Sequence, residues 1–268
     1  MRGKVLNTLR EKTVFLLDMD GTIYLGDQLI DGSKFFLDII KQKGKRYIFL
    51  TNNSSKSKEV YVEKLNGLGI QSTPEEVFTS GEATTMYINK QKPGARIFLL
   101  GTESLEEEFS RQGFVLIKDR HKDIDYVVLG FDTTLTYEKL WIACEYISEG
   151  VEYIATHPDF NCPLPNNKFM PDAGAMAAFI EASTGRTPKI IGKPNKEIVD
   201  SIALKYDFNK KDMVIVGDRL YTDIKTGENA GIASVLVYTG ETKQEDYENS
   251  VVKADYVFNS VKDIINLL

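Results

Sequence analysis

The chain has 268 residues, of which 42% are hydrophobic and 27% are charged. This composition is typical of a globular protein with one large core or two moderate ones. The formal net charge of −6 argues against sequence-independent binding of nucleic acid, which requires a basic face. No apolar stretch reaches about 18 residues and the N-terminus lacks a signal-peptide core, so we expect a cytoplasmic protein without a membrane partner.

Cysteine and histidine are scarce, and this limits the metals that the chain can bind. The two cysteines, Cys144 and Cys162, are too few for a disulfide scaffold. With only two histidines, His121 and His157, they also argue against a zinc site of nitrogen and sulfur ligands. Cys144 shares a helical face with apolar neighbours, which predicts core packing rather than redox chemistry.

Short apolar runs recur along the chain, and helical patterns lie between most of them. The run Val14–Leu17 contains no polar residue, as is typical of a strand buried on both faces of a parallel sheet. Similar runs lie at 47–50, 97–100, 126–129, 153–155, 190–191, 213–216, 235–237 and 256–258. Strands that alternate with helices predict an α/β protein with a doubly wound, mostly parallel sheet.

Three segments carry signals for the ends of helices. Thr73 precedes Pro74 and stands three residues before Glu76, which predicts that a helix begins there. Asn195 is expected to cap a second helix, and Gly44 is expected to end a third.

Polar residues follow several of the expected strands at their carboxyl ends. They are Asp18 and Asp20 after the first run, Thr51, Asn52 and Asn53 after the second, Lys193 after 190–191, and Asp218 with Asp223 after 213–216. Because the carboxyl ends of neighbouring parallel strands meet in one crevice, we expect these side chains to form one site. Carboxylate oxygens without histidine suit a hard cation such as Mg²⁺, whereas a lysine and a threonine suit a phosphate.

This inventory predicts phosphoryl transfer to an aspartate. Asp18 is the expected nucleophile, which would form an aspartyl-phosphate by attacking a phosphate monoester. Asp20 is expected to protonate the leaving alkoxide and then to deprotonate the water that hydrolyses the intermediate.

Phosphate binding is assigned to the ends of the other strands. Lys193 is expected to hold both Asp18 and the phosphoryl group, and Thr51 is expected to donate to a phosphoryl oxygen. The polar loop with Asn52 and Asn53 is expected to bind phosphate or substrate.

Metal binding is assigned to the carboxylates. A carboxylate and a phosphate dianion repel each other, so the attack of Asp18 needs a cation between them. Asp218 is expected to complete the Mg²⁺ site. Asp223 is expected to orient a metal-bound water or the Lys193 ammonium from behind the direct ligands.

The sequences DMDGT, TNN, GKP and GDRLYTD occur in this order and resemble the four motifs of the haloacid dehalogenase superfamily of phosphatases. Stretches at 99–105, 128–132, 155–159 and 185–188 are similar to its 4-nitrophenylphosphatase branch. The resemblance implies a Rossmann-like core at 1–81 and 185–268, with a large α/β cap inserted at 82–184. It also implies a small phosphorylated metabolite as substrate and allows a homodimer formed through the cap.

The resemblance further implies how the metal is bound. Asp18 and Asp218 would bind Mg²⁺ through their side chains, and Asp20 through its backbone carbonyl, which leaves its carboxyl for proton transfer. Two positions depart from the branch, because His157 stands where it usually has Asn and Asp172 where it usually has Gly. His157 is therefore a candidate substrate contact, with a structural histidine as the equal alternative.

Other functions are compatible with part of the pattern. A phosphotransferase of the same fold is one alternative, since an alcohol could replace water as acceptor. A receiver-type signalling module also places Asp, Thr and Lys at strand ends, but its aspartyl-phosphate persists and gives Asp20 no purpose. A dehalogenase of the same superfamily needs neither Asp20 nor a metal.

Overall fold

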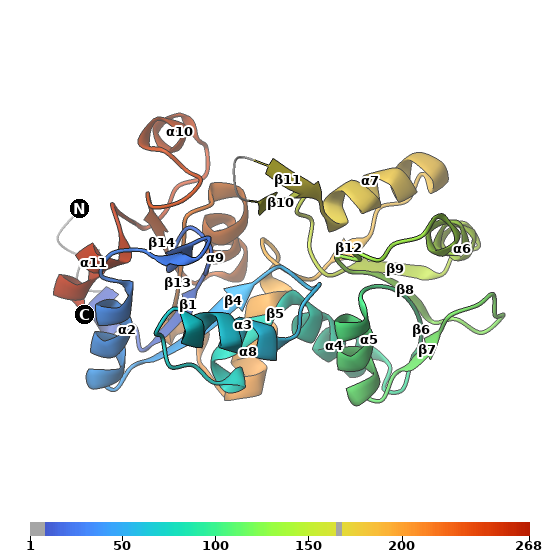
Figure 1. Ribbon diagram of the computed structural model, residues 1–268, viewed down its shortest axis with the longest axis horizontal. Helices are drawn as coiled ribbons and strands as arrows, with labels where there is room; N and C mark the ends of the chain where they lie inside the picture. The colour runs from blue at the N-terminus through green and yellow to red at the C-terminus, as the bar shows by residue number, and fades with distance from the viewer. Residues whose placement is uncertain (1–8, 165–167) are drawn as a thin grey trace. The chain divides into compact units, whose positions relative to one another are not determined.

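The structure, a computed structural model, describes residues 9–164 and 168–268. The chain divides into two compact units (Figure 1). Unit 1 contains the described residues as far as Thr51, Tyr61–Phe78 and Lys193–Leu268. Unit 2 contains Asn52–Val60 and the described part of Thr79–Gly192, so it extends beyond the expected insertion at both ends.

Unit 1 is built on a six-stranded parallel sheet with the order β15-β14-β13-β1-β4-β5. The strands are β1 (Val14–Leu17), β4 (Arg46–Thr51), β5 (Val77–Thr79), β13 (Met213–Gly217), β14 (Ala233–Val237) and β15 (Tyr256–Phe258). The strand order runs outward in both directions from the centre and reverses between β1 and β13. The expected doubly wound α/β sheet is thereby confirmed.

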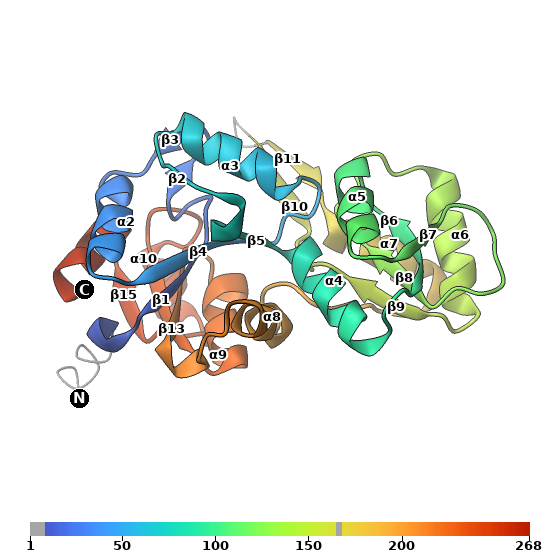
Figure 2. The ribbon, with the colours of Figure 1, turned by 90° about the horizontal axis from the view of Figure 1, so that it is seen from below.

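Helices cover both faces of this sheet (Figure 2). One core cluster joins Phe15 and Leu17 of β1 to apolar side chains of the helices α2 (Ser33–Gln42), α3 (Lys58–Gly67) and α11 (Val261–Ile264). On the other face lie α8 (Lys196–Tyr206) and α9 (Lys225–Ala230), which contact each other. Gly227 of α9 lets that helix approach β14 and β13, since an added Cβ would lie 2.7 Å from Ser234 Cβ and 3.2 Å from Ile215 Cγ2. Covering on both faces explains why all four residues of β1 are buried.

The remaining elements of unit 1 are short. They are β2 (Tyr24–Leu25), β3 (Gln28–Leu29), η1 (Pro74–Glu76), η2 (Lys210–Asp212), η3 (Leu220–Ile224), α10 (Gln244–Asn249) and η4 (Ile265–Leu267). β2 and β3 form an antiparallel pair directly after the first strand-end carboxylates.

All three expected helix ends coincide with a helix start or end in the structure, but two of them differ in detail. The Thr73 N–H donates to Glu76 Oε2 at 3.1 Å as the motif predicts, but only one 3₁₀ turn follows before the chain enters β5. A helix therefore begins at the expected place, but it is a single 3₁₀ turn, because the β-forming residues Val77 and Phe78 that follow are buried in a strand. Asn195 does precede α8, although its side chain makes no capping hydrogen bond. Gly44 follows the end of α2 with a φ of 67°, as expected.

Unit 2 contains a five-stranded parallel sheet with the order β12-β9-β8-β6-β7. Its strands are β6 (Arg96–Leu100), β7 (Val115–Ile117), β8 (Tyr126–Leu129), β9 (Glu152–Ala155) and β12 (Lys189–Ile190), and its helices are α4 (Ser80–Gln91), α5 (Glu103–Arg111), α6 (Tyr137–Ser148) and α7 (Ala173–Thr184). A core cluster links β6, β8 and β9 to α6 and α7, and Cys144 packs against it as predicted.

An antiparallel hairpin of β10 (Asn161–Leu164) and β11 (Lys168–Pro171) precedes α7 in unit 2. Its strands are mostly exposed and contain Pro163, so the sequence has no apolar run from which they could be predicted. Within residues 9–164 and 168–268, none of the helices has the length and apolar character needed to cross a membrane.

Candidate active site

Asp18 and Asp218 follow the two central strands of unit 1, β1 and β13, where the strand order reverses. The pairing of these strands continues to the site, because the Asp18 N–H donates to the Val216 carbonyl at 2.9 Å. In doubly wound sheets the ligand crevice lies at this reversal point. The backbone ladder thus brings the two carboxylates together.

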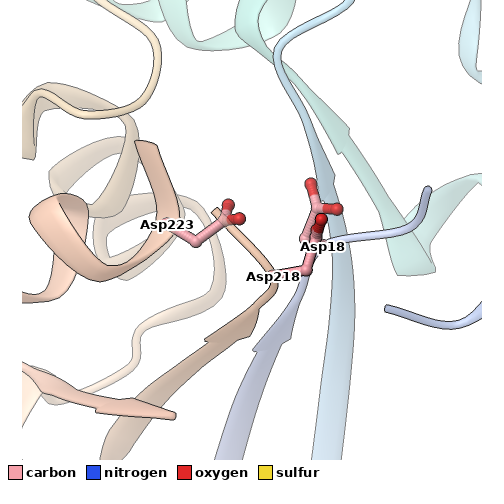
Figure 3. Close-up of side chains that lie close together, drawn as sticks. All are labelled: Asp18, Asp218 and Asp223. Atoms are coloured by element: carbon pink, nitrogen blue, oxygen red, sulfur yellow. The ribbon is translucent and has the colours of Figure 1, made fainter. Parts of the chain in front are cut away.

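A third carboxylate joins them from the helical segment after β13. Oxygens of Asp18, Asp218 and Asp223 all lie within 4.8 Å of one another. Figure 3 shows Asp223 reaching from its helical turn toward the other two side chains. Gly217 makes this possible, since a Cβ there would overlap the Asp223 carboxylate.

Lys193 binds two of these three carboxylates. Its Nζ donates to Asp18 Oδ1 at 2.5 Å and to Asp223 Oδ1 at 2.7 Å, and only 4% of its side chain is exposed. The other oxygen of Asp223 accepts the Arg219 N–H at 3.1 Å. The structure therefore brings together four of the residues expected at one site: Asp18, Lys193, Asp218 and Asp223.

The cluster has more negative charge than its lysine can balance. Burial raises the pKa of Asp18 to about 8, with Asp223 and Asp218 adding to the effect and Lys193 opposing it. Burial and the charge of Asp223 raise the pKa of Asp218 to about 6. Burial alone would lower the pKa of Lys193, but Asp18 and Asp223 more than compensate and raise it. A further cation would relieve this imbalance.

Asp20 begins the turn between β1 and β2. Its backbone forms an isolated bridge with Tyr24, and the adjoining Gly21 N–H donates to the Tyr24 carbonyl at 2.8 Å. The residue is exposed, yet the protein atoms around its carboxyl raise the pKa of Asp20, while Lys64 and Arg219 act in the opposite direction. A raised pKa favours the protonated form that a proton donor needs.

Sequence reasoning missed the residues that hold Asp218. Its Oδ2 accepts the Glu241 N–H at 2.7 Å, and Thr22 Oγ1 donates to its Oδ1 at 3.4 Å. A Cβ on Gly21, whose φ is +89°, would lie 2.6 Å from Asp218 Oδ2, and one on Gly240 would overlap the same oxygen. Gly21 and Thr22 stand in the DMDGT motif and could have been found there. Gly240 and Glu241 follow β14, where no sequence pattern points to the site.

Arg219 is a second cation near the carboxylates, and it is not among the residues predicted at the strand ends. It follows Asp218 directly, and its Nε lies 3.0 Å from Glu241 Oε2. Burial alone would lower the pKa of Arg219, but Asp18 and Asp218 outweigh burial and raise it. Its place in the GDRLYTD motif was the available signal.

The other predicted site residues lie on both sides of the division between the units. Thr51 ends β4 in unit 1 and is half-buried. Asn52, Asn53 and His157 belong to unit 2. Asn53 Oδ1 accepts hydrogen bonds from the N–H and the hydroxyl of Ser55 at 2.9 and 2.8 Å. Substrate binding by these asparagines stays a prediction.

His157 is completely buried inside unit 2. Its Nε2 lies 2.9 Å from Asp172 Oδ1, and its Nδ1 lies 2.9 Å from Thr156 Oγ1. Both ring nitrogens thus have protein partners, which favours a structural role. Direct contact of His157 with substrate stays a prediction.

Comparisons with known proteins agree with this geometry. A family model described as haloacid dehalogenase-like hydrolase matches residues 15–115, and a HAD-hydrolase-like model matches residues 190–264. An acid sugar phosphatase of Staphylococcus aureus is 38% identical over 257 residues, which cover 96% of this chain and 98% of that protein.

Solved structures are similar along nearly the whole chain. A 4-nitrophenylphosphatase from Thermotoga maritima is 49% identical with a TM-score of 0.92, covering 97% of this chain and 98% of its own. A glycerol phosphate phosphatase from Mycobacterium tuberculosis, in complex with calcium, is 30% identical with a TM-score of 0.88, covering 96% and 76% respectively.

The similarity extends across both units and includes the strand-end residues. The first family match contains Asp18 and Thr51, and the second contains Lys193, Asp218 and Asp223. The chain therefore belongs to the haloacid dehalogenase-like hydrolases, among the phosphoric monoester hydrolases that resemble 4-nitrophenylphosphatase.

Proposed function

We propose that the protein hydrolyses small phosphate monoesters with Mg²⁺, through an aspartyl-phosphate formed on Asp18. The observation that carries this proposal is the position of Lys193, whose Nζ donates to Asp18 and Asp223 at 2.5 and 2.7 Å. An ammonium held there fixes the attacking carboxylate and offers positive charge to a phosphoryl oxygen.

The donor set around Lys193 fits Mg²⁺. The three clustered carboxylates offer only oxygen ligands, and burial together with their mutual repulsion raises the pKa of Asp18 and of Asp218. Asp18 and Asp218 would hold the ion by their side chains and Asp20 by its backbone carbonyl, with Asp223 orienting Lys193. When bound, Mg²⁺ supplies the charge that allows a carboxylate to approach a phosphate dianion.

The first half of the reaction transfers the phosphoryl group to the protein. Asp18 forms a bond to phosphorus as the ester P–O bond breaks, while Asp20 gives its proton to the departing oxygen. The raised pKa of Asp20 supports this, since it favours the protonated carboxyl. Lys193 and Thr51 donate to the phosphoryl oxygens.

The second half returns the protein to its starting state. Asp20 is now a carboxylate and takes a proton from a water molecule that attacks the phosphorus. The bond between phosphorus and Asp18 breaks, and inorganic phosphate leaves. Asp20 thereby recovers the proton that it gave to the alcohol.

The names of the relatives suggest small polyol and aryl phosphates as substrates of this protein. The relatives described above are named for sugar phosphate, glycerol phosphate and 4-nitrophenyl phosphate. The test is a steady-state screen of these esters, nucleotides, phosphoglycolate and pyridoxal phosphate, ranked by kcat/KM with Mg²⁺ and with EDTA. We expect turnover that falls by about 100-fold or more in EDTA and returns with Mg²⁺.

The same screen separates the alternatives. A protein that hydrolyses none of these esters would contradict the proposal, and undiminished turnover in EDTA would contradict its metal. A phosphotransferase stays the second candidate, because Asp20 could deprotonate an alcohol as well as water. It would phosphorylate an added alcohol in preference to releasing phosphate. A receiver-type module would instead keep the aspartyl-phosphate.

A further inference from the structure

The chain passes between unit 1 and unit 2 at four places, and three of the crossings meet inside unit 2. Asn52 follows the first crossing, Ser80 is the second residue after the third, and Gly192 precedes the fourth. The Ser80 hydroxyl donates to the Asn52 carbonyl oxygen. A Cβ on Gly192 would lie 2.7 Å from Asn52 Oδ1 and 3.1 Å from Ser80 Cβ. Asn52 is thus packed between the other two crossings.

The Asn52 amide is bound by a carboxylate from another part of unit 2. Its Nδ2 donates to Asp159 Oδ2 at 3.1 Å, and the residue is only 6% exposed. The other Asp159 oxygen is buried and accepts no hydrogen bond within residues 9–164 and 168–268. A buried oxygen without a hydrogen bond costs free energy, and the side-chain hydrogen bond that the described residues give to the Asp159 carboxyl group is the one from the Asn52 amide.

The segment that carries Asp159 binds the fourth crossing as well. The Gly192 N–H donates to the Thr156 carbonyl at 2.7 Å. The Thr156 hydroxyl lies 3.0 Å from the Ser54 hydroxyl, two residues beyond Asn52. One short segment, 156–159, therefore holds the chain that leaves Thr51 and the chain that leads to Lys193.

This segment is rigidly placed. The Gly174 N–H donates to the Asp159 carbonyl at 2.8 Å, and a Cβ on Gly174 would overlap the Pro158 carbonyl. His157, inside the segment, is fixed by Asp172, which also caps α7 through the Ala173 N–H at 2.6 Å. A segment anchored to a helix start has little freedom to follow Asn52, so Asn52 must conform to it.

We propose that Asp159 is a positioning residue that acts through Asn52. Their hydrogen bond fixes the peptide that follows Thr51 and, through Gly192, the peptide that precedes Lys193. This inference rests on the proposed function, in which Thr51 and Lys193 donate to the phosphoryl group. It gives Asn52 a role in placing its neighbours rather than in touching the substrate. Small displacements of phosphate-binding groups cost large factors in rate, on the order of 100-fold for 1 Å.

The test exchanges the donor and the acceptor. Asn52→Asp alone places two carboxylates face to face, and we expect kcat/KM to fall at least 10-fold. Asp159→Asn alone keeps an amide oxygen as acceptor, and we expect a loss of less than about 3-fold. In the double variant Asn52→Asp with Asp159→Asn, the new amide donates to the new carboxylate. We expect this exchange to restore kcat/KM to within about 3-fold of the original protein.

A second cycle and a matched control guard against misfolding. Asn52→Ala and Asp159→Ala combined should be no worse than Asn52→Ala alone, since both remove the same bond. Asp119→Asn removes an exposed carboxylate of unit 2 and should leave kcat/KM unchanged. Circular dichroism and the melting temperature are recorded for every variant.

The outcomes distinguish this inference from the proposed function. Rescue by the exchange, with non-additive alanine variants, supports the positioning role. If the original protein is active but the exchanged variant is as impaired as Asn52→Asp, the Asn52 amide itself contacts the substrate and the inference is overturned. If the original protein hydrolyses no phosphate ester, the proposed function fails and takes this inference with it.

Discussion

Lys193 Nζ lies 2.5 Å from Asp18 Oδ1, although 175 residues separate the two along the chain. The same ammonium binds Asp223, so one cation joins the expected nucleophile to the segment after β13. Without it, two largely buried carboxylates would face each other with no compensating charge. Lys193 is therefore the first residue to test.

Lys193→Met keeps the length of the side chain and removes its charge. We expect kcat to fall by about 100-fold or more, because the phosphoryl group loses a donor and Asp18 loses its restraint. Steady-state kinetics with 4-nitrophenyl phosphate measure this. Lys196→Met, an exposed lysine three residues on, serves as the control. Equal activity of the two variants would remove Lys193 from the mechanism.

Asp18→Asn should abolish turnover, since an amide does not attack phosphorus. The fold should persist, because asparagine has nearly the same shape and still accepts a hydrogen bond from Lys193. Activity and the trapping of phosphoprotein by acid quench are the measurements. Asp27→Asn, an exposed residue of the neighbouring β-hairpin, is the matched control. Substantial phosphoprotein in the Asp18→Asn variant would mean that another group is the nucleophile.

Asp20→Asn should slow esters according to their leaving groups. An alkyl phosphate needs its alkoxide protonated, whereas 4-nitrophenolate leaves without help, so glycerol phosphate should suffer at least 10-fold more in the first half-reaction. Burst kinetics separate formation of the intermediate from its hydrolysis. Equal losses for both esters would exclude Asp20 as the general acid.

Asp218→Asn should make the metal-free protein more stable at high pH. The pKa of Asp218 is about 6 in the folded state and 3.8 in its ordinary state, so folding binds a proton between these values. Stability is therefore lost as pH rises through this range, and the cost is complete above about pH 6. The Asp218→Asn variant has no such ionisation, so its free energy of unfolding should exceed that of the original protein by about 1 kcal/mol at pH 8 in EDTA.

Urea unfolding at pH 4.5 and pH 8, with EDTA and with Mg²⁺, measures this effect. The advantage of Asp218→Asn should vanish at pH 4.5. It should also reverse in Mg²⁺, since only the original protein gains stability from binding the ion. A variant that is less stable than the original at pH 8 in EDTA would show that the carboxylates do not repel one another.

Gly240→Ala tests the packing around Asp218. An added Cβ would overlap Asp218 Oδ2, so the carboxylate or the loop must move. We expect a loss of about 1–3 kcal/mol in the free energy of unfolding. We also expect the apparent affinity for Mg²⁺, measured by activity titration, to be at least 10-fold weaker. Gly67→Ala is the control, because nothing lies within 4 Å of the Cβ that it would add. If both glycines tolerate alanine equally, Gly240 does not hold Asp218 in place.

The strand-end residues were predictable because their strands are buried on both faces. Four apolar residues precede Asp18, and four precede Gly217 and Asp218. Neither face of such a buried strand accommodates a polar side chain, so the polar residues lie just beyond the strand ends. The helices that cover the sheet were predictable as well, because helical patterns alternate with the apolar runs along the sequence. The fold class and the cluster of Asp18, Lys193, Asp218 and Asp223 could thus be predicted.

Contacts between loops could not be predicted in the same way. Gly240 and the Glu241 N–H reach Asp218 only because β14 lies beside β13 and its loop turns back over the strand ends. The bond between Asn52 and Asp159 likewise joins residues 107 positions apart. Such pairs depend on the three-dimensional path of the chain, which leaves no periodic trace in either segment.

The register between β1 and β13 also fixes the positions of Asp18 and Asp218 relative to each other. Val14 to Leu17 stand opposite Met213 to Val216, residue by residue, so the backbone sets how far each carboxylate protrudes beyond the sheet. Side chains alternate along a strand, and one inserted residue would turn every later side chain to the opposite face. The loops that join the strands can therefore vary in length, whereas the strands themselves tolerate changes of residue but not of number.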